Sequence, residues 1–279
     1  MNSTQMESSM LNNARQPVLF LSHGGGPLPL LNDPGHAGLI DAYAQIRNKL
    51  KALEEKPSAL LFISAHWEAD EFTITAASQT SLYYDYYGFP DAAYQVTYPV
   101  PGAVALASRI RDKLNDQEVP AHLDETRGLD HGVFVPGIML FPEAEIPCLQ
   151  LSLLKTLDPA AHLKLGQLLQ ELRQENVMII GSGFSFHNMR AFFQPGTQAE
   201  VDLNLAFEGW LSETLLDCND AEREQRLLNW ETAPGARFCH PREEHLLPIH
   251  VCAGASGSKA SQQWRFTTLG REGSCYWWD

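Results

Sequence analysis

The sequence has no long hydrophobic run, no paired cysteines and no excess of positive charge. None of its apolar runs approaches the roughly 20 residues of a membrane span, so we expect no membrane partner. A formal net charge of -14 disfavours nucleic acid and anionic lipid surfaces, because both attract cations. The five cysteines are scattered without a Cys-x-x-Cys pair, which disfavours a disulfide framework and a thiolate zinc site. Unpaired thiols of this kind are typical of a reducing, cytoplasmic location.

Residues 1–16 are polar and lack the apolar segment of a secretory signal. We interpret them as a disordered N-terminal tail outside the fold. Residues 17–279 belong to a chain with 44% hydrophobic composition, which is enough for one large α/β domain with a well-filled core.

Apolar runs and amphipathic segments alternate along most of this domain. The spacing of apolar residues predicts strands at 17–21, 59–64, 71–77, 119–123, 145–153, 177–180, 263–269 and 274–278. It predicts helices at 36–56, 102–115, 158–175, 199–217, 220–230 and 241–253. The alternation indicates a largely parallel sheet with helices on both faces.

Residues 81–101 are unusually rich in tyrosine, proline and glycine for a solvated loop. One interpretation is a loop that packs over the core through its own rings. The other is a wall for a flat, apolar ligand, to which Tyr86 and Phe89 would contribute. The two interpretations are compatible.

Five histidines are the strongest indication of a functional site in the sequence. His23 ends the first predicted strand and precedes three glycines, and His66 ends the second strand. His187 lies just beyond a later strand, His131 lies in a loop before an apolar segment, and His245 lies in the first turns of the 241–253 helix. Because the carboxyl ends of parallel strands meet at one edge, several of these imidazoles are expected to converge and bind a metal.

Other interpretations of these segments are weaker. The glycines after His23 suit a phosphate loop, but no Gly-Lys-Ser/Thr follows them. Gly181-Ser182-Gly183 lacks the Gly-x-Ser-x-Gly pattern of a hydrolase turn, and no His-Glu-x-x-His is present. We interpret the remaining histidines as surface or structural residues; they are His36, His122, His162, His240 and His250. Candidates to orient the metal-binding rings are Glu68, Asp130 and Glu244, which are close to these histidines in sequence.

An ordered set of motifs resembles the class III extradiol ring-cleavage dioxygenases, in the DOPA 4,5-dioxygenase-like branch. The motifs are Ser22–Pro27, Ile63–Trp67, Tyr86–Pro90, Tyr98–Gly102, Gly128–Gly132, Gly181–Gly183 with His187–Asn188, and Glu244–Pro248. The resemblance covers residues 17 to about 253 and implies a single extradiol dioxygenase-like catalytic domain around a mixed sheet. It also implies one mononuclear metal site near one end of that sheet.

The resemblance further implies roles for individual residues. His23, His66 and His245 match metal ligands, and His187 matches either a fourth ligand or an acid/base. His131 matches a catalytic histidine on the substrate side of the site. Better-known class III enzymes place a glutamate at the third ligand position, so Glu244 competes with His245 for that role. An all-histidine site suits Zn²⁺ as well as Fe²⁺.

These observations predict an Fe²⁺-dependent dioxygenase that opens a catechol ring with O₂. Its substrate-binding residues would be His131, Tyr86 and Phe89, and the protein would be a monomer or homodimer. The alternatives are a zinc-dependent hydrolase or lyase and a non-catalytic metal-binding protein on the same scaffold.

Overall fold

The computed structural model describes residues 15–194 and 196–279. The predicted disordered tail falls almost wholly on residues 1–14, which lie outside the described residues. Gln16 belongs to the fold: its side chain is only 2% exposed, and its backbone N–H donates to the Arg173 carbonyl.

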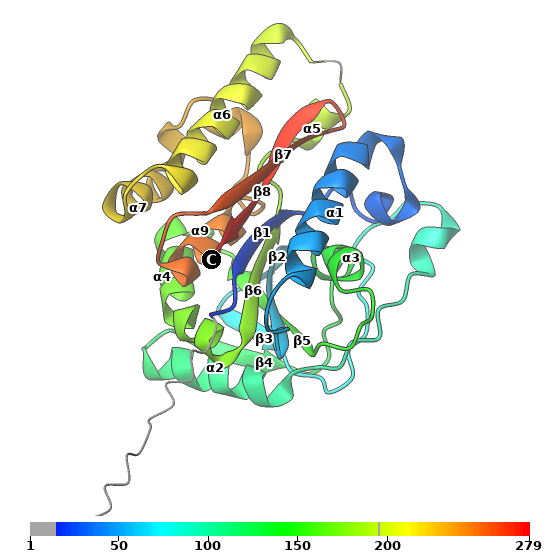
Figure 1. Ribbon diagram of the computed structural model, residues 1–279, viewed down its shortest axis with the longest axis vertical. Helices are drawn as coiled ribbons and strands as arrows, with labels where there is room; N and C mark the ends of the chain where they lie inside the picture. The colour runs from blue at the N-terminus through cyan, green and yellow to red at the C-terminus, as the bar shows by residue number, and fades with distance from the viewer. Residues whose placement is uncertain (1–14, 195) are drawn as a thin grey trace, which may run out of the picture.

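Eight strands form one sheet in the order β4-β3-β5-β2-β6-β1-β8-β7 (Figure 1). They are β1 (Val18–Ser22), β2 (Ala59–Ala69), β3 (Phe72–Thr75), β4 (Ala121–Asp124), β5 (Cys148–Leu154), β6 (Val177–Gly183), β7 (Gln262–Thr268) and β8 (Arg271–Trp278). The central pairs β5-β2, β2-β6 and β6-β1 are parallel, whereas β3-β5, β1-β8 and β8-β7 are antiparallel. The predicted mixed, largely parallel sheet is confirmed, including the two C-terminal strands that extend it.

Helices cover both faces of this sheet. The α-helices are α1 (Ala37–Lys51), α2 (Val104–Asp116), α3 (His131–Leu140), α4 (Pro159–Leu169), α5 (Met189–Phe192), α6 (Gln198–Leu216), α7 (Asp220–Leu228), α8 (Ala236–Cys239) and α9 (Leu247–Ser256). Short 3-10 helices span Leu28–Leu31, Pro34–His36, Asp91–Tyr94, Gln170–Glu175 and Trp230–Thr232. In Figure 1, α4 and α9 lie on one side of the central strands and α1 and α3 on the other.

Local signals explain why most predicted elements form. Asp158 caps α4 by accepting a hydrogen bond from the Ala160 backbone N–H, and Pro159 supplies the first helical residue. β1 and β6 are buried along their whole length, as their uninterrupted apolar sequences predict.

Two elements near the histidines differ from the sequence prediction. His131 was expected in a loop, but it is the first residue of α3, which is buried almost all round and contains Pro136. A helix without a polar face has no 3.6-residue periodicity to detect. The helix predicted over 241–253 begins only at Leu247, where Pro248 suits the first turn, so His245 lies in the turn before α9.

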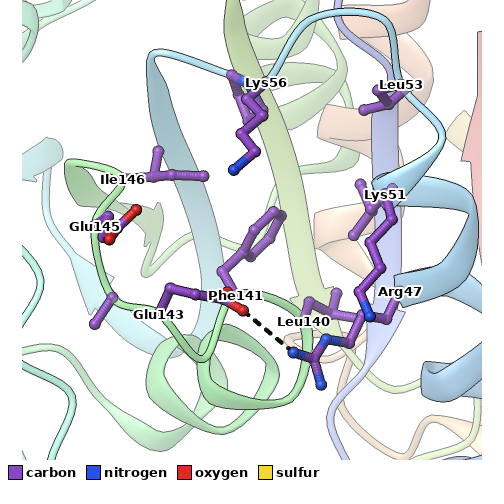
Figure 2. Close-up of a pocket in the computed structure, with 12 residues that line it drawn as sticks. Arg47, Lys51, Leu53, Lys56, Leu140, Phe141, Glu143, Glu145 and Ile146 are labelled. Atoms are coloured by element: carbon purple, nitrogen blue, oxygen red, sulfur yellow. Dashed lines mark hydrogen bonds and ion pairs between the residues drawn. The ribbon is translucent and has the colours of Figure 1, made fainter.

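A cavity of about 260 Å³ lies at the amino ends of β2 and β5 (Figure 2). Lys56 precedes β2, Ile146 precedes β5, and the Arg47–Glu143 ion pair of 3.4 Å borders the cavity. None of the described residues that line it is a histidine or a cysteine. Among the described residues, no helix is both long and apolar enough to cross a membrane.

Candidate metal centre and active site

The five predicted histidines converge at the carboxyl edge of the parallel strands. His23 directly follows β1 and His187 follows β6, while His131 opens α3 and His245 precedes α9. His66 lies inside β2, at a point where the pairing with β5 is interrupted. Ile63 pairs with Leu151 but Glu68 pairs with Leu153, so β2 carries extra residues that bulge away from the ladder. Such bulges redirect a side chain, and this one brings His66 to the other histidines.

Three Nε2 atoms face one another at the centre of the group. The His66 Nε2 lies 3.0 Å from the His23 Nε2 and 3.2 Å from the His245 Nε2. His131 is adjacent, with its ring centroid 3.9 Å from that of His66. The ring of His187 stacks on that of His245, with 3.3 Å between centroids and 14° between planes.

The opposite nitrogen of each ring faces a polar partner. The His23 Nδ1 contacts the Ser182 hydroxyl at 3.0 Å. Asp85 approaches the Nδ1 of both His131 and His66, at 2.8 and 3.3 Å. In the same way, Glu244 Oε1 approaches the Nδ1 of both His245 and His187. Those distances are 2.9 and 3.2 Å.

An ionised carboxylate can only accept, so the Nδ1 atoms that face Asp85 and Glu244 act as donors, and the Nε2 atoms of His66 and His245 are left to face inward. Burial would raise the pKa of Asp85, but hydrogen bonding and the charges of His131 and His66 outweigh it and hold that pKa below its ordinary value. The pKa of Glu244 is also lowered, because its contacts with His187 outweigh its burial. Both carboxyl groups are therefore ionised near neutral pH.

The three facing rings, those of His23, His66 and His245, are neutral because their pKa values are low. Burial lowers the pKa of His23, His66 and His245 well below the ordinary histidine value, and the neighbouring imidazoles lower it further. Neutral imidazole is the form that binds metals.

Two independent observations indicate that the arrangement of these side chains fits a divalent cation. His23, His66 and His131 have ligand atoms within 4.8 Å of one another, and so do His187, Glu244 and His245. Two nitrogens that each lie about 2.1 Å from one tetrahedral ion are separated by roughly 3.4 Å. The Nε2 separations of 3.0 and 3.2 Å are close to this value.

Two glycines make the close packing possible. A Cβ atom on Gly183 would lie 2.1 Å from the carbonyl oxygen of His245, so only glycine lets β6 pass beneath that residue. Gly26 has a φ of +54° and packs under the ring of Phe89, and glycine adopts that backbone region without strain. The glycine turn predicted beside His23 is therefore part of the site.

A cavity of about 430 Å³ opens beside the histidines. Its remaining walls are almost entirely apolar and include Tyr86, Phe89, Phe184 and Phe192. The 81–101 segment also packs through its own rings, since the centroid of the Tyr86 ring lies 5.3 Å from that of Phe89 and 5.4 Å from that of Tyr94. Both interpretations of this segment agree with the structure, which places Tyr86 and Phe89 in the cavity wall.

The residues that orient the rings were predicted less well. Glu244 contacts two histidines as expected. Glu68 instead pairs with Arg242, and the buried Asp130 carboxylate contacts Ser64 and Gln150. The two latter predictions are wrong because proximity in sequence does not set the direction of a side chain.

Asp85 was missed altogether, since it lies among tyrosines with no histidine beside it in the sequence. The histidines interpreted as surface or structural are absent from the cavity wall. His122 is exposed, whereas the four buried ones are His36, His162, His240 and His250.

Comparison with known proteins defines the class of protein to which this fold and site correspond. The family described as the catalytic LigB subunit of aromatic ring-opening dioxygenase matches residues 17–274. The chain belongs to this family, the class III extradiol dioxygenases, which are metal-dependent.

Particular relatives narrow the comparison. The chain is 40% identical to a dioxygenase, tasH, from Hapsidospora irregularis, over 94% of this chain and 85% of the relative. It is 36% identical to the 4,5-DOPA dioxygenase extradiol of Beta vulgaris, over 88% of this chain and 89% of the relative. A crystal structure of an uncharacterized Escherichia coli K12 protein superimposes with a TM-score of 0.73 at 26% identity. It covers 95% of this chain and 100% of the other.

Proposed function

We propose that this protein opens a catechol ring with O₂ next to its two hydroxyl groups, at a metal held by His23, His66 and His245. The observation that carries the proposal is the set of three neutral, buried rings whose Nε2 atoms face one another. Relatives named 4,5-DOPA dioxygenase extradiol support a catechol substrate. His245 is favoured over Glu244 as ligand, because Glu244 Oε1 contacts the Nδ1 side of the ring.

We assign His187 an acid/base role in preference to that of a fourth ligand. Each nitrogen lone pair lies in the plane of its ring, and two nearly parallel planes with centroids 3.3 Å apart do not meet at one nearby ion, so His187 and His245 cannot both bind it without rotating. With its Nδ1 facing Glu244, His187 would exchange a proton with the substrate through its Nε2.

His131 is the second acid/base and the substrate-side histidine. Its Nδ1 and its backbone N–H both bond to Asp85 Oδ1, and its ring lies 5.8 Å from that of Tyr86. The Nε2 can accept a hydroxyl proton from a catechol in the cavity, and Asp85 stabilises the resulting imidazolium. Tyr86 and Phe89 would contact the ring and exclude water.

Fe²⁺, when bound, would lower the pKa of a catechol hydroxyl and supply redox chemistry toward O₂ that Zn²⁺ lacks. The second candidate function is therefore a zinc-dependent hydrolase or lyase, since an all-histidine ligand set also suits zinc.

Anaerobic reconstitution with Fe²⁺, followed by O₂ uptake and the appearance of a yellow ring-opened product from a catechol panel, tests the proposal. Activity with Fe²⁺ but not Zn²⁺ supports the dioxygenase, and no O₂ uptake with any catechol contradicts it. The His131→Ala and His187→Ala variants are expected to bind at least one metal ion for every two chains. The His23→Ala and His66→Ala variants are expected to lose the bound metal. Loss of metal from His131→Ala would mean that His131 is a ligand.

A further inference from the structure

The cavity beside the histidines contains no cationic side chain. The residues that line it include histidines, glycines, aromatic rings and the apolar side chains Leu28, Met189 and Leu269, but no lysine or arginine from the described part of the chain. A carboxylate on a ligand would lose its water there without gaining a protein counter-charge. Moving an ionised carboxylate from water into an apolar cavity without a counter-charge is strongly unfavourable.

Two of the three arginines nearest in sequence to the site are engaged elsewhere, and the third does not line the cavity. Arg127 stacks on Trp67, with 4.6 Å from guanidinium to ring, and also bonds to the His66 carbonyl outside the cavity. Arg242 forms a bidentate pair with Glu68. Arg190 lies on α5 between two lining residues, but it is exposed and does not line the cavity itself.

The only carboxylate among the lining residues is also engaged. Asp33 Oδ2 bonds to the His36 Nδ1 at 2.7 Å, and the His36 Nε2 accepts the Gly25 backbone N–H at 2.9 Å. Asp33 therefore fixes the glycine turn beside His23.

The outer part of the cavity wall is apolar and partly open to solvent. Met189 and Phe193 are 53% and 76% exposed, although both line the cavity, and Phe192 lies between them in sequence. Exposed apolar groups grouped at a cavity are typical of a place where an apolar part of a ligand packs. This group, Met189, Phe192 and Phe193, is called the apolar rim.

We propose that the site selects uncharged catechols with an apolar substituent and that the apolar rim binds the substituent. This inference rests on the proposed ring-opening function. It assigns the chain a substrate class without the carboxylate of an amino acid or phenolic acid.

The test compares 3-(3,4-dihydroxyphenyl)propionate with its methyl ester, which differ mainly in charge. With Fe²⁺-loaded protein we expect kcat/KM for the ester to exceed that for the acid at least tenfold. Binding to the Zn²⁺-loaded protein, measured by calorimetry under anaerobic conditions, should show the same order of affinity. Equal or tighter binding of the acid overturns the proposal.

Two variants locate the effect. Phe193→Lys places a cation on the exposed apolar rim and should reduce the ester-to-acid ratio at least threefold. Leu228→Lys adds the same charge on α7, which does not line the cavity, and should leave the ratio unchanged. If the acid is preferred and Arg190→Ala removes that preference, the arginine reaches the ligand and the proposal is wrong. If no catechol is consumed, the ring-opening function fails, while the binding comparison still decides the charge selection.

Discussion

A buried carboxyl group on α6 makes the stability of the protein depend on pH in a calculable way. Glu208 is fully buried, its Oε2 accepts a hydrogen bond from the Ser274 hydroxyl at 2.6 Å, and its Oε1 has no partner among the described residues. Burial raises the pKa of Glu208 from an ordinary 4.5 to about 7. The folded state therefore holds a proton at pH 6 that the unfolded state has released.

The direction of the effect follows from this raised pKa. The proton stabilises the folded state fully below pH 4.5, and that stabilisation is lost as the pH rises through about 7. Between pH 5.5 and 8.5, pKa values of 4.5 and about 7 correspond to a loss of about 2 kcal/mol in the free energy of unfolding.

The substitution Glu208→Gln removes the titration and keeps the shape. We expect the free energy of unfolding of the variant to gain about 2 kcal/mol relative to wild type between pH 5.5 and 8.5. Urea unfolding at both pH values, with metal content held equal, measures this double difference. Glu224→Gln on α7 makes the same charge change at an exposed position and should show less than a quarter of the effect. A Glu208→Gln difference that does not vary with pH would refute the reasoning.

Two further substitutions test the site, and a third on α6 is their control. Asp85→Asn leaves one acceptor oxygen for the rings of both His131 and His66, so we expect kcat, measured by O₂ uptake, to fall by about 10²-fold or more. An unchanged kcat would mean that Asp85 only supports the fold. Gly183→Ala should displace His245 and reduce both bound metal and the melting temperature, by metal analysis and circular dichroism. Gly209→Ala is the control, because its new Cβ would meet nothing within 4 Å, and it should stabilise α6 by about 0.5–1 kcal/mol. An equal loss of melting temperature in Gly183→Ala and Gly209→Ala would contradict the steric argument.

The strand content and the histidine set could be predicted from the sequence because both have local signals. β1, β2 and β6 each begin with an apolar run, and His23 and His187 come shortly after the end of β1 and β6. Their convergence needs only the rule that parallel strands end at a common edge.

The orientation of the rings could not be predicted in this way. Asp85 contacts His131 from 46 residues away, and the 81–101 segment that carries it has no helical or strand periodicity. Helix α3 also had no periodic signal, because water touches almost none of its residues. In each case, contacts between distant segments determine the outcome.

The position of β1 within the sheet has a consequence for synthesis of the chain. β1 pairs with β6 on one side and with β8 on the other, and both partners come much later in the sequence. β1 is therefore made before either of its pairing partners, and its edge toward β8 stays unpaired even after β6 has been made. Its apolar residues then need protection from association with other chains. Since His23 directly follows this strand and His245 precedes α9, the histidines of the site can meet only after the segment between them has been made and has folded.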